Sequence, residues 1–340
     1  VSCWSRNLTL SASLCFSEAI KYQDQVSDLK SVRCSAALLH CNAGLTNTFL
    51  GDDKAAVNKL KKLLALWECL GGSGGYFVGR TKFLLGVEYE RLQDKTRAFQ
   101  SFMEALVVFC GDEVNVEGRE INETCAKLSL PDLTEIALTH GTKCKQAIAK
   151  YIEEELGHAH TLDGNLLKAN KYLHQSLAIR EQMNDDPDNN LDMALILQQV
   201  AKNNRKLGEG EKALEQMHNA MRFMTESGER NGHYANLLVD FGLTLGVVTK
   251  DHELSQSKFV EACCELMKNK ADDSAIHRVL KHLDAEHLML VATVECSASH
   301  IGMIVSYLSC SYLQSSSSQD TVHALSCTNL ALSMLEDMPT

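Results

Sequence analysis

The amino-acid sequence predicts an all-α protein, an α-solenoid of stacked antiparallel helix hairpins, from a repeated pattern of small residues and a scarcity of proline. Each copy of the pattern has a small residue, a second one about twelve positions later, and an apolar residue beyond it. The copies begin at Gly44, Gly86, Gly157, Ala201 and Gly242. Two helices approach closely where Gly, Ala or Ser faces the partner, so each copy predicts a hairpin. The 340 residues include only three prolines, which permits long helices.

The spacing of these copies sets the repeat length. The small residues that begin them are 42, 71, 44 and 41 positions apart, so the basic unit is close to 42 residues. The clearest copy places Gly86 before Ala98, Phe102 and Ala105. A hairpin of this kind buries its apolar face only against its neighbours, so residues 1–340 are expected to form one elongated repeat domain rather than separate globular ones.

Turn-forming residues separate the repeats and mark one insertion. The repeats are expected near 1–28 (partial), 29–70, 76–110, 143–184, 188–226, 230–268 and 284–337. The long 71-residue spacing places an insertion at 111–142, with an acidic, polar loop at 111–130 and a helix from Pro131. Gly141 is expected to break or kink that helix, because Gly costs ~1 kcal/mol relative to Ala. The first small-residue pattern after Val1, at Ala12, Phe16 and Ala19, is that of a second helix, so the sequence is expected to be a fragment of a longer chain.

Apolar residues at helical spacing between those turns predict where the helices run. The expected helices lie near 7–22, 28–50, 53–69, 77–93, 95–109, 132–163, 165–184, 188–207, 209–226, 231–249, 251–268, 273–281, 284–313 and 320–337.

Charge and cysteine content exclude several classes of protein. The net charge is −11, whereas a nucleic-acid surface or an anionic lipid surface requires a basic stripe on its partner. The sequence has no run of eighteen uncharged apolar residues and no signal-peptide pattern in residues 1–20, so no membrane insertion is expected. Thirteen cysteines without regular spacing fit buried thiols in a reducing compartment, which predicts a cytoplasmic protein.

Residues 172–224 carry a family resemblance. They contain the motifs Leu177-Ala178-Ile179-Arg180-Glu181, Pro187-Asp188, Leu197-Gln198-Gln199-Val200-Ala201, Leu207-Gly208 and Lys212-Ala213-Leu214. These motifs resemble the 42-residue tetratricopeptide repeat of kinesin light chains and nephrocystin-3-like proteins. The chain departs from that repeat at Asn204, where the family usually has Tyr, and at Gln198-Gln199, where it usually has Asn-Asn.

The resemblance implies a right-handed, tetratricopeptide-like superhelix that acts as a protein–protein interaction scaffold and holds a peptide or partner segment in its concave groove. The first helix of each hairpin would line that groove, and residues three and four apart share a helix face. The expected groove positions are Arg80, Phe83, Glu90, Arg91, Glu154, His158, Gln198, Lys202, Arg205 and Lys206. The basic residues from Lys202 to Lys206 predict an acidic peptide as partner. The alternative is a solvated helix face without a ligand.

Motifs that would carry chemistry are weak. Gly74–Thr81 matches a phosphate-loop pattern except for an Arg in place of the Lys, but no strand precedes it, so a loop between hairpins is the preferred interpretation. Two pairs at helical spacing supply two ligands each, fewer than the four of a structural zinc site: His140 with Cys144, and Cys296 with His300. The sequence therefore predicts no enzyme, cofactor or metal site.

Two other functions stay open. A regulatory or ligand-sensing repeat region of a larger multidomain protein, such as a nucleotide-switching enzyme, would suit a fragment. An enzyme on a helical-repeat scaffold would need a deep pocket with titratable groups of perturbed pKa.

Overall fold

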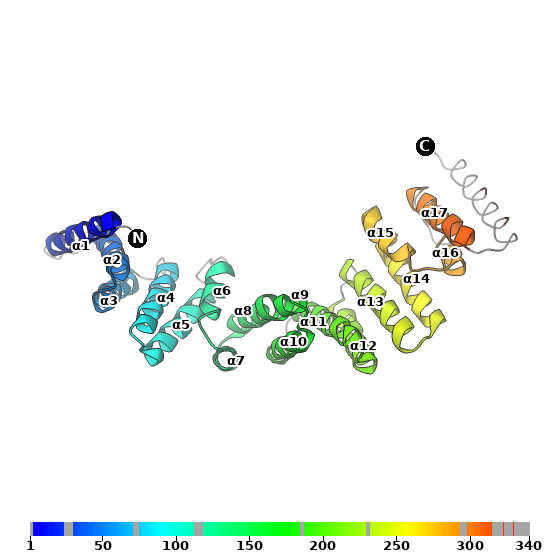
Figure 1. The fold of residues 1–340 in the computed structure, drawn as a ribbon, viewed down its shortest axis with the longest axis horizontal. Coiled ribbons are helices and arrows are strands. Elements are labelled where there is room, and N and C mark those ends of the chain that lie inside the picture. Colours follow the sequence, from blue (N-terminus) through cyan, green and yellow to red (C-terminus); the bar gives the residue numbers. More distant parts are fainter. Residues whose placement is uncertain are drawn as a thin grey trace. The chain divides into compact units, whose positions relative to one another are not determined.

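The computed structural model describes residues 3–23, 30–70, 75–111, 118–183, 187–228, 232–292 and 298–314, with the single positions 322 and 329. Every regular element among these residues is a helix, and consecutive helices pack as hairpins, which confirms the predicted all-α solenoid (Figure 1). The chain divides into two compact units, Val1–Ile152 and Glu153–Thr340. Whether the repeats over 1–340 act as one domain stays a prediction.

The first unit is a series of helices in which each of the first five packs against the next. Its helices are α1 (Cys3–Gln23), α2 (Lys30–Leu50), α3 (Asp53–Leu70), α4 (Gly75–Arg91), α5 (Lys95–Phe109), α6 (Gly118–Cys125), α7 (Leu130–Thr139) and α8 (Thr142–Tyr151). Its core is rich in aromatic rings, with Phe83, Phe102 and Phe109 all buried.

The second unit has an aliphatic core in which methionines fill part of the space, with Met193, Met217 and Met224 buried. A π-helical segment, Ile152–His158, precedes the helices of this unit. They are α9 (Ala159–Leu162), α10 (Leu166–Arg180), α11 (Pro187–Lys206), α12 (Gly210–Ser227), α13 (Gly232–Val248), α14 (His252–Lys268), α15 (Asp273–Leu280), α16 (Ala285–Ala292) and α17 (Ala298–Gln314). α11 packs on α12, and α13 on α14.

The predicted loop at 111–130 is wrong where the structure has α6. Acidic side chains of this helix find partners on α4 and within α6 itself. Glu123 pairs with Arg80 at 3.1 Å and with Arg119 at 2.9 Å, and the Tyr76 hydroxyl donates to Glu120 at 3.2 Å. These long-range contacts stabilise a helix in a segment whose polarity alone predicts a loop.

The predicted helix 132–163 is divided, and the break at Gly141 is confirmed. Ser129 begins α7 with a capping box, in which the Ser129 side chain and the Asp132 carboxylate each accept a backbone amide of the other residue. α7 ends at Thr139, and Gly141 is the N-cap of α8. An extended backbone at His140 and Gly141 separates the two helices.

The predicted helix 284–313 is also not continuous. α16 and α17 pack against each other, so they lie side by side (Figure 1). Residues 293–297 lie outside the described residues, as does the predicted helix 320–337 apart from positions 322 and 329.

The two helices of a hairpin cross at glycines, where the facing helix leaves no room for a side chain. A Cβ built on Gly86 would lie 2.6 Å from the ring of Phe102. The same construction on Gly242 gives 2.8 Å to the ring of Phe259. Both rings are buried and cannot move aside, so the close crossing requires glycine at these positions. The tight crossings that the sequence pattern predicts are present.

A residue with left-handed backbone ends the first helix of five hairpins. The φ angles are +78° at Gly51, +61° at Gln93, +77° at Gly164, +79° at Gly208 and +57° at Lys250. These residues are 42, 71, 44 and 42 positions apart, close to the spacings of the small-residue pattern. The turns therefore support the repeat register independently of the helix crossings.

The residue after four of these turns caps the second helix. A side-chain oxygen accepts the backbone amide three residues ahead at Asp52, Asp94, Asn165 and Asp251. Such N-caps satisfy an amide that has no partner within the helix and contribute roughly 1 kcal/mol each.

We expect Gly242→Ala to destabilise the second unit by about 1–3 kcal/mol, because the new Cβ meets the ring of Phe259. Gly302 is the matched control, since it also lies inside a helix but a Cβ there meets nothing within 4 Å. Gly302→Ala should stabilise by up to about 1 kcal/mol through helix propensity. Urea denaturation followed by circular dichroism measures both, and equal effects would contradict the assigned crossing.

We expect Lys250→Gly to stabilise the second unit by about 1 kcal/mol, because glycine adopts the left-handed backbone of that turn without the Cβ penalty. Gly208→Ala makes the opposite change in the preceding hairpin and should destabilise by a similar amount. The midpoints of urea denaturation test the pair, and a lower midpoint for Lys250→Gly would show that its turn conformation is different.

Candidate functional site

The first helices α11, α13 and α15 of the second unit line a pocket of about 400 Å³, which we call the α11–α13–α15 groove. Its lining is mostly polar and includes Gln198, Lys202, His233, Asn236, Asp240, Arg278, Lys281 and His282. Three of these side chains are cationic and one is anionic. The groove thus has positive character in a chain whose net charge is −11.

Asp240 compensates the charge of Lys202 within the groove. The Lys202 Nζ lies 2.7 Å from Asp240 Oδ2, and the Gln198 side-chain amide donates to the same oxygen. Arg205 donates to the Asp240 carbonyl oxygen at 3.3 Å and to Thr244 Oγ1 at 3.2 Å. Of the basic residues predicted for α11, Lys202 and Arg205 therefore bind α13, and Lys202 also lines the groove.

Arg278 and Lys281 are the uncompensated cations of the groove. Both side chains are exposed, and neither makes an ion pair with any residue that the structure describes. Because the charges of Lys202 and Asp240 cancel each other, Arg278 and Lys281 give the groove its positive charge. A guanidinium and an ammonium group together suit a partner with carboxylate or phosphate oxygens.

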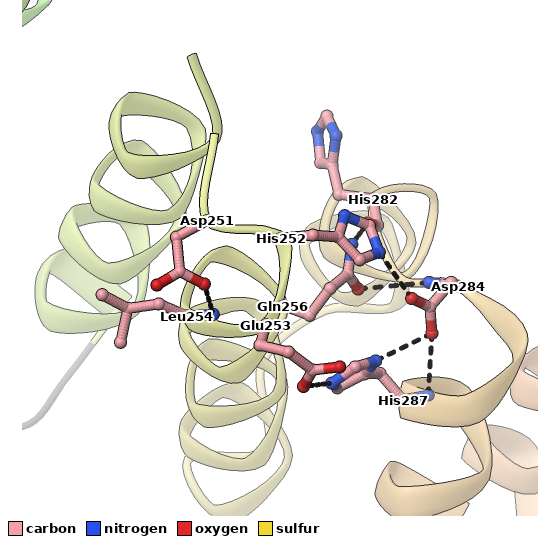
Figure 2. Close-up of polar contacts among 8 residues, drawn as sticks. All are labelled: Asp251, His252, Glu253, Leu254, Gln256, His282, Asp284 and His287. Atoms are coloured by element: carbon pink, nitrogen blue, oxygen red, sulfur yellow. Dashed lines mark hydrogen bonds and ion pairs between the residues drawn. The ribbon is translucent and has the colours of Figure 1, made fainter. Parts of the chain in front are cut away.

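Gln256 of α14 fixes the backbone of the loop that carries Lys281 and His282 (Figure 2). Its side-chain nitrogen donates to the carbonyl oxygen of His282 at 2.9 Å, and its side-chain oxygen accepts the amide of Asp284 at 3.2 Å. Gln256 is buried, so solvent does not compete for these two bonds.

Asp284 ties the same loop to α14 and α16 (Figure 2). His252 Nε2 and His287 Nδ1 each lie 2.8 Å from the Asp284 carboxylate, which also accepts the His287 amide at 3.0 Å. Burial opposes ionisation of Asp284, but the hydrogen bonds from His287 and His252 outweigh it and hold the pKa of Asp284 below its usual value. The carboxylate is therefore the stable form at neutral pH.

His282 contributes a neutral ring to the groove. Its imidazole stacks on the ring of Phe259 with 5.1 Å between centroids. Burial, with a smaller effect from the charge of Lys281, lowers the pKa of His282 below its ordinary value. At neutral pH the ring therefore offers one donor and one acceptor rather than a charge.

Two of the predicted groove residues in the first unit take part in packing. Phe83 is 8% exposed and lies against the ring of Phe102 in the aromatic core. Arg80 pairs with Glu123 at 3.1 Å and lies over the Phe83 ring, 5.0 Å from its centroid. The Phe83 ring is therefore a core element rather than a surface that a partner contacts.

The other two predicted residues of the first unit join neighbouring helices. Glu90 is exposed and pairs with Lys127 at 2.8 Å. Arg91 lies 3.8 Å from Asp53 and donates to the carbonyl oxygen of Thr48 at 3.2 Å. Glu90 and Arg91 thus pair with other residues of this chain, although the sequence analysis expected them to contact a partner.

The six predicted residues of the second unit divide between two places. Gln198, Lys202 and Arg205 belong to the groove or its supporting contacts, and Lys206 is exposed at the end of α11. Glu154 is exposed and His158 half-buried on the π-helical segment. Their role in binding stays a prediction.

Asparagine side chains join successive hairpins at the position where the chain departs from the family repeat. Asn170 donates to Asn204 at 2.6 Å, and Asn203 donates to Asn170 at 2.9 Å. Asn203 also approaches Thr161 at 3.4 Å. Asn204 is 5% exposed, so it contributes to packing between repeats rather than to an open surface.

A buried guanidinium between two carboxylates connects the π-helical segment to α10 and α11. Arg180 is 4% exposed and lies 3.2 Å from Glu153 and 2.5 Å from Asp192. Burial raises the pKa of Glu153 to about 7, although the charge of Arg180 opposes this shift. The two carboxylates thus share one cation, and Glu153 is the more buried of them.

Sequence reasoning missed Arg278, Lys281, His233 and Asn236. The predicted helices 231–249 and 273–281 continue the series of first helices, so extending the groove face to them would have found Arg278. Lys281 lies beyond the end of α15, and its place depends on the loop conformation that Gln256 and Asp284 fix.

The described part of the phosphate-loop pattern lies in a helix, so the expected loop is wrong there, whereas the predicted helix 77–93 already covers residues 77–81. Residues 75–81 form the first turns of α4, and the Thr81 hydroxyl donates to the carbonyl oxygen of Phe77 at 2.7 Å. A Cβ on Gly79 would meet the ring of Phe109 at 2.6 Å. These residues serve helix packing, while Gly74 is outside the described residues.

Of the two His–Cys pairs, the structure describes both members only for His140 and Cys144, and these two belong to no metal-binding group among the described residues. His140 Nδ1 lies 2.9 Å from the carbonyl oxygen of Ile136, and Cys296 is outside the described residues. Across the described ranges, no three His, Cys, Asp or Glu side chains lie where they could hold a metal ion together. Of the helices described, none is both long and apolar enough to span a bilayer.

Comparison with known proteins gives only distant likenesses. No protein-family model and no curated protein matches the chain. The apo quorum sensor NprR of B. thuringiensis is 17% identical, with 86% of this chain and 80% of that chain covered and a TM-score of 0.37. BtubC (BKLC) of P. vanneervenii is 14% identical over 85% of this chain and 92% of its own, with a TM-score of 0.34.

A putative kinesin light chain of Podospora anserina with nearly identical TPR-like repeats is 12% identical, covering 72% of this chain and all of that one, with a TM-score of 0.32. At these values the likenesses define no family. The helices and their crossings define the class: an all-α protein of stacked helix hairpins with a polar groove along its first helices.

We expect the stability of the wild type, relative to a Glu153→Gln variant, to fall between about pH 4.5 and pH 7. The folded-state pKa of Glu153 is raised to about 7, above its unfolded value. The stability that protonation of Glu153 contributes is therefore fully present below the unfolded pKa and is lost as the pH rises through 7. Gln keeps the hydrogen bond with Arg180 without titrating. Urea denaturation at pH 5 and pH 8 should show a difference of ~2 kcal/mol in the relative stability. A constant difference would contradict the raised pKa.

Proposed function

We propose that the protein is a protein–protein interaction scaffold that holds an acidic linear peptide in the α11–α13–α15 groove. The observation that carries the proposal is the pair of exposed, uncompensated cations, Arg278 and Lys281, on a groove formed by three successive first helices. Charge complementarity then favours Asp- and Glu-rich segments and disfavours basic ones.

The groove supplies hydrogen-bonding groups beside these cations. His233, Asn236 and the neutral His282 line it, so a peptide can also use its backbone amides and carbonyls. The cations would attract the peptide and the neutral groups would orient it, which suits an extended segment that crosses several helices.

Our proposal assigns the attraction of an acidic partner to other residues than the sequence analysis did. The sequence analysis assigned it to Lys202, Arg205 and Lys206, but Lys202 is paired with Asp240 and Arg205 binds α13. Reversing Lys202 would leave Asp240 unpaired in a buried position, so such a variant mixes lost stability with lost binding. Arg278 and Lys281 test binding more cleanly because they lack ion pairs with described residues.

We expect the double variant Arg278→Glu/Lys281→Glu to bind a synthetic Asp/Glu-rich peptide at least tenfold more weakly than the wild type. Each reversal of an exposed charge changes the interaction by ~1 kcal/mol or more. Fluorescence anisotropy of the labelled peptide measures the affinity, which should fall as salt shortens the screening length below ~10 Å.

The matched control is Lys168→Glu/Lys171→Glu, which changes the net charge equally at exposed positions of α10. It should leave the affinity within about twofold, and a peptide with Asn and Gln in place of the acids should not bind. Equal losses in the two double variants would attribute binding to net charge alone and reject the groove as its site.

A further inference from the structure

Another pocket of the second unit, of about 360 Å³, lies between the second helices α10 and α12, and we call it the α10–α12 pocket. The helix α11 packs against both of these helices and lines the pocket with them. The α10–α12 pocket shares no lining residue with the α11–α13–α15 groove, and its volume is within the range of ligand pockets.

The interior of the α10–α12 pocket is apolar. Leu177 of α10 and Met193 and Leu197 of α11 line it with side chains that belong to the core of the second unit. Each of these residues is at most 6% exposed, whereas Phe223 of α12, which also lines the pocket, is half-buried. An apolar side chain of a partner is favoured in such a cleft, because its insertion removes apolar surface from water.

The next hairpin bridges the corresponding position with a side chain of its own. The counterpart of Met193 is Tyr234, 41 positions later, which is also the spacing from Ala201 to Gly242. The Tyr234 hydroxyl donates to Glu261 of α14 at 2.9 Å, so this side chain spans from α13 to α14. The Met193 side chain makes no hydrogen bond with α12, and the cleft beside it stays open.

The rim of the α10–α12 pocket carries an unpaired negative charge. Glu181 directly follows α10, is exposed, and makes no ion pair within the part of the chain that the structure describes. The cation of the rim, Arg222, lies over the Phe223 ring, 4.9 Å from its centroid, and 4.0 Å from the Glu226 carboxylate. The available charge is therefore that of Glu181, which favours Lys or Arg on a partner and repels acids.

We propose that the α10–α12 pocket binds a partner protein through a segment that inserts one large apolar side chain and places a Lys or Arg beside Glu181. The apolar side chain would contact Leu177, Met193 and Leu197, with Phe223 beside it on α12. The basic group would pair with the Glu181 carboxylate at the rim. This chemistry is opposite to that of the acidic peptide proposed for the α11–α13–α15 groove, so the two surfaces would select different segments.

The test selects peptides from a random phage-displayed library on the full chain, with the Met193→Tyr variant as the counter-selection target. This variant copies Tyr234 and adds a ring to the pocket, while every residue that lines the α11–α13–α15 groove is unchanged. Counter-selection therefore removes peptides that bind that groove. We expect the remaining sequences to combine Leu, Met, Phe or Trp with Lys or Arg. Sequences without a basic residue, or no remaining sequence, would overturn the proposal.

A selected peptide then tests the charge at the rim by isothermal titration calorimetry. Glu181→Lys reverses an exposed charge and should weaken binding by about fivefold or more. The matched control is Glu286→Lys, which makes the same charge change at an exposed position of α16 and should leave the affinity within about twofold. Equal losses would attribute binding to net charge and overturn the proposal. If Met193→Tyr does not fold, Glu181→Lys replaces it as the counter-selection target.

Sedimentation of the full chain tests the other occupant of the pocket, a second copy of this chain. We expect the wild type and Met193→Tyr to have the same oligomeric state. Dissociation of a wild-type oligomer by this substitution would assign the pocket to self-association and overturn the proposed basic partner.

Discussion

The close crossing of the two helices in a hairpin is the constraint on which the rest of the structure depends. Where Gly86 meets the ring of Phe102, and Gly242 the ring of Phe259, one register alone brings the two surfaces together. Fixing that register fixes where each turn falls, and the left-handed turn residues accordingly recur at regular spacing. Successive first helices then line up, which is how residues of α11, α13 and α15 come to share one groove.

Much of this architecture was predictable because it depends on local chemistry. Small residues at a fixed period gave the crossings, and Gly or Asp at the turns gave most helix ends within a few residues. The short helix α6 was not predictable, since its acidic residues are stabilised by Arg80 and Tyr76, which lie over 40 positions earlier. Likewise, nothing local shows that α16 turns back to pack against α17.

The groove was predictable only in part. Helical spacing correctly places Gln198 and Lys202 on one face, but it does not reveal that Asp240, about one repeat later, neutralises Lys202. Whether a charge is available depends on the neighbouring repeat, and a single-helix view omits that neighbour. Arg278 and Lys281 supply the charge of the groove because no described acidic residue pairs with them. Their lack of a partner is a property of the folded unit rather than of any one segment.

The way in which the α15–α16 loop is attached affects how this groove can diversify. Gln256 holds the loop through the carbonyl of residue 282 and the amide of residue 284, groups that every residue other than proline provides. Lys281 makes none of these bonds, so its side chain can be exchanged while the backbone keeps its path. Related sequences could therefore alter selectivity at this position without losing the loop, because the bonds that fix the backbone do not depend on the side chain of residue 281.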